Sequence, residues 1–186
     1  MKTYNELKLA QELIRFPTVK TEDKGIMKFL SKKLSSIGFK CKVIKSKGTG
    51  TKPALNLYAK FGNSKPHINF LGHTDVVANL NNWKIPPFKA VVKKGYLNGR
   101  GSQDMKGGIA CFISAISNFI KDKNFKGSIS IIIAADEETT GLGTPAIIKY
   151  LKRKGEKIDF SIIAEPSSNK SVGDEIRIGR RGSMNG

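Results

Sequence analysis

The chain is organised around the stretch Phe70-Leu71-Gly72-His73-Thr74-Asp75-Val76-Val77. The apolar run at residues 68–71 predicts a strand, and side chains two residues apart in a strand point to the same side. His73 and Asp75 therefore leave the end of this strand together. An imidazole that binds a metal usually donates its other N–H to a carboxylate, which fixes the tautomer of the ring. The pair fits that arrangement, and it also fits an ordinary surface hydrogen bond.

Length and composition indicate a globular chain. The 186 residues are enough for one domain with its own core, or for a piece of a larger protein. Hydrophobic residues make up 39% and charged residues 26%, as in soluble proteins. No stretch has the length of a membrane span and the first residues do not resemble a signal peptide, so we expect a cytoplasmic location without membrane partners. Cys41 and Cys111 have no metal-type spacing.

The formal net charge is +18, from 33 Lys and Arg against 15 Asp and Glu. Such a charge attracts nucleic acid and anionic substrates. The lysines are spread along the whole chain, outnumber the arginines and are not interleaved with aromatic residues as in a nucleic-acid platform. We therefore interpret them as a solvated surface and predict no specific nucleic-acid partner. A basic nucleic-acid-associated protein stays open as an alternative.

Helical and strand patterns alternate along the chain. A capping-box spacing at Thr3–Glu6 precedes a first helix that ends before Pro17. A second helix is expected at 23–37, and later helices at 109–120 and 144–154. Strands are expected at 39–45, 55–61, 67–71, 128–135 and 159–164, with an edge strand or hairpin at 90–97. This alternation predicts an α/β fold with a mixed, mostly parallel sheet and helices on both faces.

Acidic residues and a histidine follow three of the predicted strands and precede one helix. They are His73, Asp75, Asp104, Glu137, Glu138 and Glu165. Because the carboxyl ends of strands are where open α/β sheets bind ligands, these side chains are expected to converge. Gathered carboxylates repel one another unless a cation compensates. One histidine with several carboxylates suits zinc or a similar ion, and the acids suffice for two metals. The implied chemistry is metal-assisted hydrolysis.

Four motifs carry a family resemblance. They are Gly72-His73-Thr74-Asp75-Val76-Val77, Gly99-Arg100-Gly101-Ser102-Gln103-Asp104-Met105-Lys106-Gly107, Asp136-Glu137-Glu138 and Glu165-Pro166-Ser167. In order and spacing they resemble the dizinc peptidase and deacylase family that includes aminoacylase, acetylornithine deacetylase and succinyl-diaminopimelate desuccinylase. The resemblance implies a zinc-dependent exopeptidase-like catalytic domain.

The end of the chain, residues 173–186, most resembles the desuccinylase branch of that family. This finer resemblance implies hydrolysis of N-succinyl-LL-2,6-diaminopimelate to release succinate, in lysine and diaminopimelate biosynthesis. Acetylornithine deacetylase and other metallo-deacylases or carboxypeptidases of the family are alternatives. In each case the partner is a small molecule with an acyl-amino group.

The same resemblance implies two zinc ions in a complete site, with Co²⁺ as an alternative metal. One metal would take His73, Asp104 and Glu165. The other would share Asp104 as a bridge and take Glu138.

The resemblance also implies roles for residues beside the metals. Glu137 would be the general base that takes a proton from the attacking water and delivers it to the leaving amine. Asp75 would orient His73, and the peptide bond after Asp104 would be cis. Arg180 and Ser183 would hold the succinyl carboxylate, which suits the fork of donors on an arginine.

Members of the family are about twice this length. By the resemblance, residues 1–186 would be the N-terminal part of the catalytic domain, without its C-terminal part and without the lid that forms a homodimer. The last histidine ligand of the second metal would lie in the missing part, because His67 sits at the wrong end of its strand and is expected on the surface. We therefore expect a fragment that fills at most the first metal site and is inactive. An inactive metal-binding remnant is an alternative of another class.

A second motif competes with the metal interpretation. Gly141-Leu142-Gly143-Thr144-Pro145-Ala146 has the G-x-G-x-x-A pattern of a dinucleotide site, and Glu165 follows about twenty residues later. Residues 136–138 would place carboxylates at the helix N-terminus that a pyrophosphate must occupy. We therefore interpret these glycines as a tight turn before a helix.

Each proposed site residue also has a plainer interpretation when it is taken singly. Glu137 and Glu138 would form a solvated acidic turn, Glu165 a cap, and Asp104 the N-cap of the following helix. Arg180 would be a charged strand end. Only the joint placement at strand ends favours a metal site.

Overall fold

The computed structural model describes residues 2–47, 53–78, 81–121 and 125–179. The elements are α1 (Glu6–Ile14), α2 (Ile26–Ser35), β1 (Lys40–Ser46), β2 (Ala54–Gly62), β3 (His67–His73), β4 (Val91–Lys93), β5 (Tyr96–Asn98), α3 (Lys106–Phe119), β6 (Ser128–Ala134), α4 (Gly143–Lys154) and β7 (Phe160–Ile163). They follow the order expected from the sequence, with β4 and β5 as a hairpin. Among the described residues no helix is both long and apolar enough to cross a membrane.

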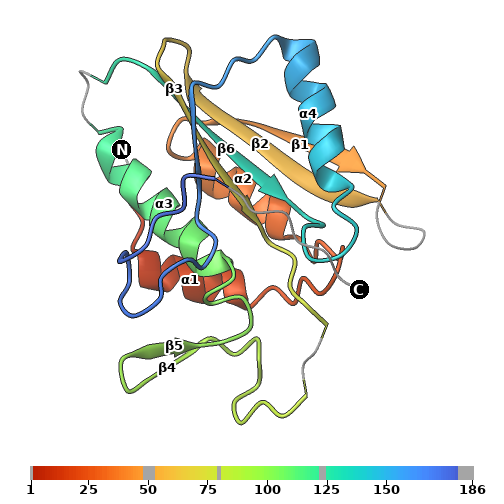
Figure 1. Cartoon of the computed structure of the whole chain (residues 1–186), viewed down its shortest axis with the longest axis vertical. Coiled ribbons are helices and arrows are strands. Elements are labelled where there is room, and N and C mark those ends of the chain that lie inside the picture. The colour runs from red at the N-terminus through yellow and green to blue at the C-terminus, as the bar shows by residue number, and fades with distance from the viewer. Residues whose placement is uncertain (1, 48–52, 79–80, 122–124, 180–186) are drawn as a thin grey trace.

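The main sheet is mixed, as expected, with the strand order β1-β2-β6-β3-β7 (Figure 1). β3 pairs in parallel with both β6 and β7, whereas β1 and β2 are antiparallel to their neighbours. In the register His73 lies opposite Ala134, and Leu71 lies opposite Ile163. The carboxyl ends of the three parallel strands therefore meet at one edge of the sheet.

Helices cover both faces of this sheet (Figure 1). On one face α2 and α3 pack against the sheet and α1 packs on α3, in the larger apolar cluster, which includes Leu13, Leu30, Ile113 and Ile131. On the other face α4 places Ile147 in a smaller cluster. All seven residues of β6 are buried, as its β-branched, two-sided apolar pattern predicts. Each fully buried leucine or isoleucine contributes about 1.5–3 kcal/mol, so the two clusters fix the strands that carry the acidic loops.

The first helix begins at a different cap from the one expected. The side chain of Asn5, and not that of Thr3, accepts the hydrogen bond from the backbone N–H of Lys8 at 2.9 Å. Tyr4 is buried, its N–H donates to the Ser117 hydroxyl at 3.1 Å, and the Ser114 hydroxyl donates to its carbonyl at 2.8 Å. These two bonds attach the start of the chain to α3 and shift the cap by two residues.

The expectation that His67 lies on the surface is wrong. The ring is 2% exposed, and its Nδ1–H donates to the carbonyl of Lys157 at 2.9 Å. Its Nε2 lies 2.8 Å from the Ser130 hydroxyl. β3 has a strand on each side, and the segment before β7 covers its first residue, so a histidine at the polar start of the strand is enclosed. It lies at the opposite end of β3 from His73.

Candidate metal centre

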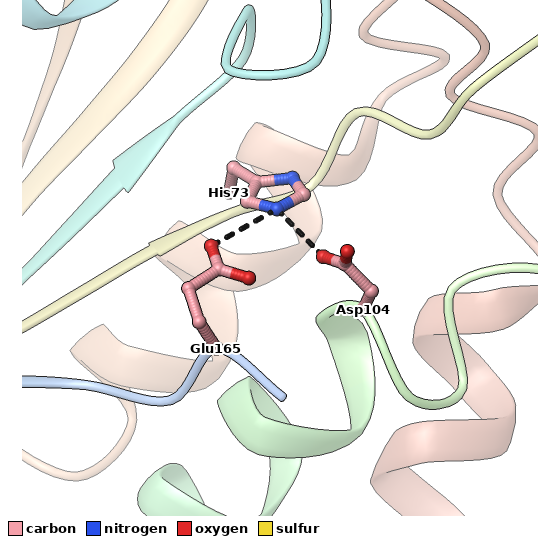
Figure 2. A group of neighbouring side chains, drawn as sticks. All are labelled: His73, Asp104 and Glu165. Atoms are coloured by element: carbon pink, nitrogen blue, oxygen red, sulfur yellow. Dashed lines mark hydrogen bonds and ion pairs between the residues drawn. The ribbon is translucent and has the colours of Figure 1, made fainter. Parts of the chain in front are cut away.

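Three of the predicted ligands converge at the carboxyl edge of the parallel strands (Figure 2). His73 is the last residue of β3, Glu165 follows the end of β7, and Asp104 precedes α3. One ligand atom from each of them lies within 4.8 Å of the others. His73 Nε2 is 2.9 Å from Asp104 Oδ1 and 3.4 Å from Glu165 Oε1. The sheet register explains the convergence, because β3 and β7 end side by side.

His73 is held by hydrogen bonds at both ring nitrogens. The ring is 1% exposed, its Nδ1–H donates to the carbonyl of Asp75 at 3.0 Å, and its Nε2–H donates to Asp104. Burial opposes the charged ring, but hydrogen bonds to the Asp75 and Glu165 carboxylates, together with their charges, outweigh it and raise the pKa of His73 to about 11. The imidazole is thus fixed with Nε2 facing the acids, and an incoming cation has to displace the proton on that nitrogen.

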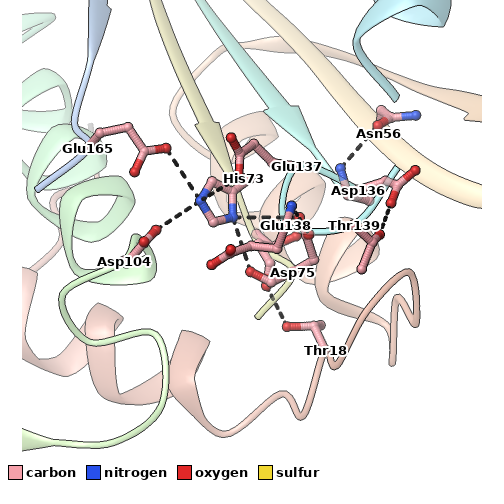
Figure 3. Close-up of polar contacts among 12 residues, drawn as sticks. Thr18, Asn56, His73, Asp75, Asp104, Asp136, Glu137, Glu138, Thr139 and Glu165 are labelled. Carbon is pink, nitrogen blue, oxygen red and sulfur yellow. Dashed lines mark hydrogen bonds and ion pairs between the residues drawn. The ribbon is translucent and has the colours of Figure 1, made fainter. Parts of the chain in front are cut away.

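Asp75 contacts two parts of the site at once (Figure 3). Its Oδ2 accepts the backbone N–H of Glu138 at 2.9 Å, and its Oδ1 lies 3.5 Å from His73 Nδ1. The sequence led us to expect the carboxylate itself to orient His73. Instead the Asp75 carbonyl makes the short bond to the ring, and the buried carboxylate adds its charge.

The loop after β6 carries the two adjacent glutamates, and Asp136 fixes its shape. The Asp136 carboxylate accepts hydrogen bonds from the hydroxyls of Thr139 and Thr140, and from the backbone N–H groups of Thr140 and Leu142 at 3.1 and 3.3 Å. Despite burial, these bonds lower the pKa of Asp136. The carboxylate is therefore bonded to the N-cap residue of α4, where its negative charge would repel a phosphate, which supports a tight turn over a nucleotide site.

Glu137 is half-exposed at the rim of the site. Its Oε2 lies 3.9 Å from His73 Nε2, close to the edge of the ring that also faces Asp104. Burial, and then the charges of Glu165, Asp75 and Asp104, raise its pKa against the opposing effect of His73. A carboxylate with a raised pKa is a stronger base toward a neighbouring water molecule.

The other acids also repel one another. Burial and the charge of Glu165 raise the pKa of Asp104, although His73 lowers it. Burial, followed by the charge of Asp104, raises the pKa of Glu138. Such a cluster favours a cation that offsets its negative charge.

The donor set fits a divalent metal. Ligand atoms about 2.1 Å from a tetrahedral zinc ion lie about 3.4 Å apart. The distance from His73 Nε2 to Glu165 Oε1 is 3.4 Å, and the one to Asp104 Oδ1 is shorter, at 2.9 Å. One imidazole and two carboxylates are ligands that zinc accepts, and they leave room for further ligands. His73, Asp104 and Glu165 can therefore hold one such ion.

Comparison with known proteins agrees with this geometry. The family model described as peptidase family M20/M25/M40 matches residues 70–179, which contain every site residue described above. The chain belongs to peptidase family M20/M25/M40. The family resemblance inferred from the four motifs is confirmed.

Curated relatives match all or nearly all of the chain. The succinyl-diaminopimelate desuccinylase of Pelagibacter ubique (strain HTCC1062) is 49% identical over 100% of this chain and 49% of its own length. That of Ehrlichia chaffeensis (strain ATCC CRL-10679 / Arkansas) is 46% identical over 95% of this chain and 47% of its own length. The chain thus spans about half the length of the curated relatives it matches, as expected.

Solved structures show the same fold. Human carnosine dipeptidase 1 superposes with a TM-score of 0.75 and 20% identity, over 87% of this chain and 38% of its own. The M20 family metallo-carboxypeptidase Sso-CP2 from Sulfolobus solfataricus superposes with a TM-score of 0.71 and 22% identity, over 87% and 37%. The expected fold is confirmed by these two structures.

Not every predicted site residue joins the compact group. Glu138 lies outside the group of three ligands whose atoms are within 4.8 Å of one another. It is nevertheless close enough to Asp104 for the charge of Asp104 to raise the pKa of Glu138. Arg180 and Ser183 lie outside the described residues. The peptide bond between Asp104 and Met105 is cis, as the family resemblance implied.

Sequence reasoning missed the buried groups that support the M20 site. Lys106 is fully buried, and its Nζ donates to the carbonyl of Phe16 at 2.8 Å. The Thr18 hydroxyl donates to the Thr74 carbonyl at 2.5 Å, and the Asn56 side chain accepts the N–H of Ala135 at 3.1 Å. Lys106 could have been noticed beside Asp104 in its motif, but nothing in the sequence pattern pairs it with residue 16.

Proposed function

We propose that this chain is the N-terminal part of a metal-dependent amidohydrolase that removes succinate from N-succinyl-LL-2,6-diaminopimelate. The observation that carries the proposal is the convergence of His73, Asp104 and Glu165 on one point. Two curated relatives with 46% and 49% identity, both succinyl-diaminopimelate desuccinylases, point to this substrate within the family.

We assign the metal site to zinc, with Co²⁺ as the alternative. His73, Asp104 and Glu165 would hold the first ion, and Asp104 with Glu138 would hold part of a second. A bound ion of this kind supplies positive charge that acidifies a water molecule and polarises an amide carbonyl.

The residues of this chain have separate tasks in the proposed reaction. Glu137 accepts the proton of the attacking water and passes it to the leaving amine, for which its raised pKa suits it. Asp75 keeps the His73 ring in place through its carbonyl and links it to the loop that carries Glu137. Arg180 and Ser183 are assigned to the succinyl carboxylate on the strength of their motif alone.

The remaining parts of the assignment follow from the same proposal. Residues 1–186 correspond to the N-terminal part of the catalytic domain, and the rest of the enzyme supplies the last histidine ligand and the dimer contact. A cytoplasmic location suits a biosynthetic desuccinylase. Without that histidine ligand, the 186 residues alone would bind one metal and release no succinate.

Metal binding tests the site. Competition against a chromophoric zinc chelator should show one tight site in the 186-residue chain. His73→Ala and Asp104→Ala should each weaken zinc binding by at least about a hundredfold, since each removes a direct ligand. Glu12→Gln, which changes an acid on α1 that is paired with Lys33, should leave it unchanged. Equal loss in the control and site variants would contradict the assignment.

Substrate turnover tests the activity separately. Succinate release from N-succinyl-LL-2,6-diaminopimelate is compared with acetate release from N-acetylornithine, for this chain and for the protein joined to the remaining half of the Pelagibacter relative. The joined protein should release succinate, and Glu137→Ala should abolish the release. Preferential release of acetate would favour acetylornithine deacetylase, and tight zinc binding without release of either would leave an inactive metal-binding protein.

A further inference from the structure

A separate pocket on the α4 side of the sheet is lined by residues of β1, β2 and the last turn of α4. Figure 1 shows where these three elements lie. Its volume is about 450 Å³, which is within the range of small-ligand sites. One of its lining residues, Lys60, lies opposite Ser130 in β6, whereas the metal site begins beyond Ala134. Four residues of strand span about 13 Å, so the pocket lies toward the other end of the sheet.

Four ammonium groups line this pocket against one carboxylate. Lys40 and Lys60 are directly opposite each other in the β1–β2 register, an arrangement of like charges that destabilises a strand pair. Lys42 points to the same face as Lys40, and Lys154 comes from α4. Glu156 binds Lys60 at 2.6 Å and leaves a positive excess. Lysines on the edge strand β1 can be explained because they discourage pairing with a strand of another chain. That explanation does not cover the lysines on β2 and α4.

The lining of the pocket includes a buried tyrosine hydroxyl. Tyr58 is 5% exposed, and in the part of the chain that the structure describes its hydroxyl lies near the Glu156 carboxylate and the Ser130 hydroxyl without a hydrogen bond of good geometry to either. Burial and the nearby Glu156 carboxylate raise its pKa, so the hydroxyl keeps its proton. Its ring packs against Tyr150 with the centroids 5.7 Å apart. An acceptor atom placed in the pocket with better geometry would give this hydroxyl a full hydrogen bond, as buried polar groups usually have.

We propose that this pocket binds a small phosphate-bearing polyanion, with Lys40, Lys42 and Lys154 around its charges and the Tyr58 hydroxyl donating to one of its oxygens. Lysine binds phosphate as a compact point charge, and a multiply charged ligand relieves the repulsion between Lys40 and Lys60. The inference does not depend on the proposed function, because no residue of the metal site lines the pocket.

Calorimetric titration with inorganic pyrophosphate tests the proposal. Pyrophosphate chelates zinc, so the titration uses the metal-free chain in EDTA, and His73→Ala should bind pyrophosphate as the unchanged chain does. The double variant Lys40→Gln/Lys42→Gln should bind about tenfold more weakly. The matched double variant Lys8→Gln/Lys28→Gln, which removes the same charge from exposed positions on α1 and α2, should stay within about twofold.

Tyr58→Phe separates a built site from diffuse attraction. It leaves the charge unchanged and should weaken pyrophosphate binding about threefold or more, with no loss of thermal stability. The proposal is overturned by equal weakening in both lysine double variants, or by unchanged binding in Tyr58→Phe. It is also overturned if pyrophosphate does not saturate the protein while succinate or a short DNA duplex does.

Discussion

The carboxylate of Asp75 accepts a hydrogen bond from the backbone N–H of Glu138 at 2.9 Å, across 63 residues of sequence. This bond joins the end of β3, which carries His73, to the loop after β6, which carries Glu137 (Figure 3). Asp75 is 1% exposed, so the bond is shielded from water. Asp75 therefore links the two positions, because its carbonyl bonds the His73 ring and its carboxylate bonds the loop of the predicted base.

Asp75→Asn should weaken zinc binding without unfolding the protein. An asparagine can still accept from the Glu138 N–H, but it lacks the negative charge beside His73. Loss of such an outer partner typically costs about 10–100-fold in metal affinity. Chelator competition measures the affinity, and thermal unfolding of the metal-free chain should change little. Asp75→Ala, which also removes the acceptor, should lower both, and equal zinc affinity in Asp75→Asn and the unchanged chain would contradict the role.

Zinc affinity should rise with pH. The folded-state pKa of His73 is raised to about 11, so the ring carries a proton that zinc must displace throughout the neutral range. Release of one proton makes the affinity rise about tenfold per pH unit. Chelator competition at several values between about pH 6 and pH 8 gives the slope. An affinity that does not change with pH would mean that the ring is neutral before the metal binds.

Much of this fold could be predicted because its signals are local. The two-sided apolar run of β6 and the helical spacing of α2 both reflect burial of nearby side chains, and burial sets those patterns. The alternation of strands and helices predicted that side chains at the carboxyl ends of the strands would lie close together. The convergence of His73, Asp104 and Glu165 agrees with that prediction.

The rest depended on contacts between distant residues. The cap at Asn5 follows from the attachment of Tyr4 to α3, and the burial of His67 follows from a segment about ninety residues later that covers it. Lys106 likewise reaches the carbonyl of Phe16 across 90 residues. No periodicity or spacing in the sequence encodes such pairs.

Asp136→Ala should loosen the acidic loop. Its carboxylate accepts the backbone N–H groups of Thr140 and Leu142; the first would lose this partner, and the second would keep only the Thr140 hydroxyl at 3.4 Å. Removal of a loop cap of this kind costs about 2 kcal/mol in the free energy of unfolding. Denaturant unfolding measures the cost, and hydrogen exchange should quicken at Thr140 and Leu142. Asp174→Ala removes a similar loop carboxylate outside the site and should leave exchange at Thr140 unchanged.

Lys106 gives a prediction about the pH dependence of stability. Burial lowers its folded-state pKa to about 7, against the opposing charge of Asp75, from an ordinary value of 10.5. Between these two values the unfolded chain binds the extra proton, so the stability of the metal-free protein should rise from about pH 7 toward pH 10.5, and this gain should be lost as the pH falls back to 7.

Lys106→Met keeps the apolar stem of the side chain but has no group that titrates. Denaturant unfolding of both proteins at several pH values gives the difference, which should grow in favour of Lys106 as the pH rises. Lys33→Met, at a partly exposed lysine on α2 that is paired with Glu12, is the control and should show no such trend between pH 7 and 9. A constant difference between the unchanged chain and the Lys106→Met variant over this range would mean that Lys106 is charged in the fold throughout.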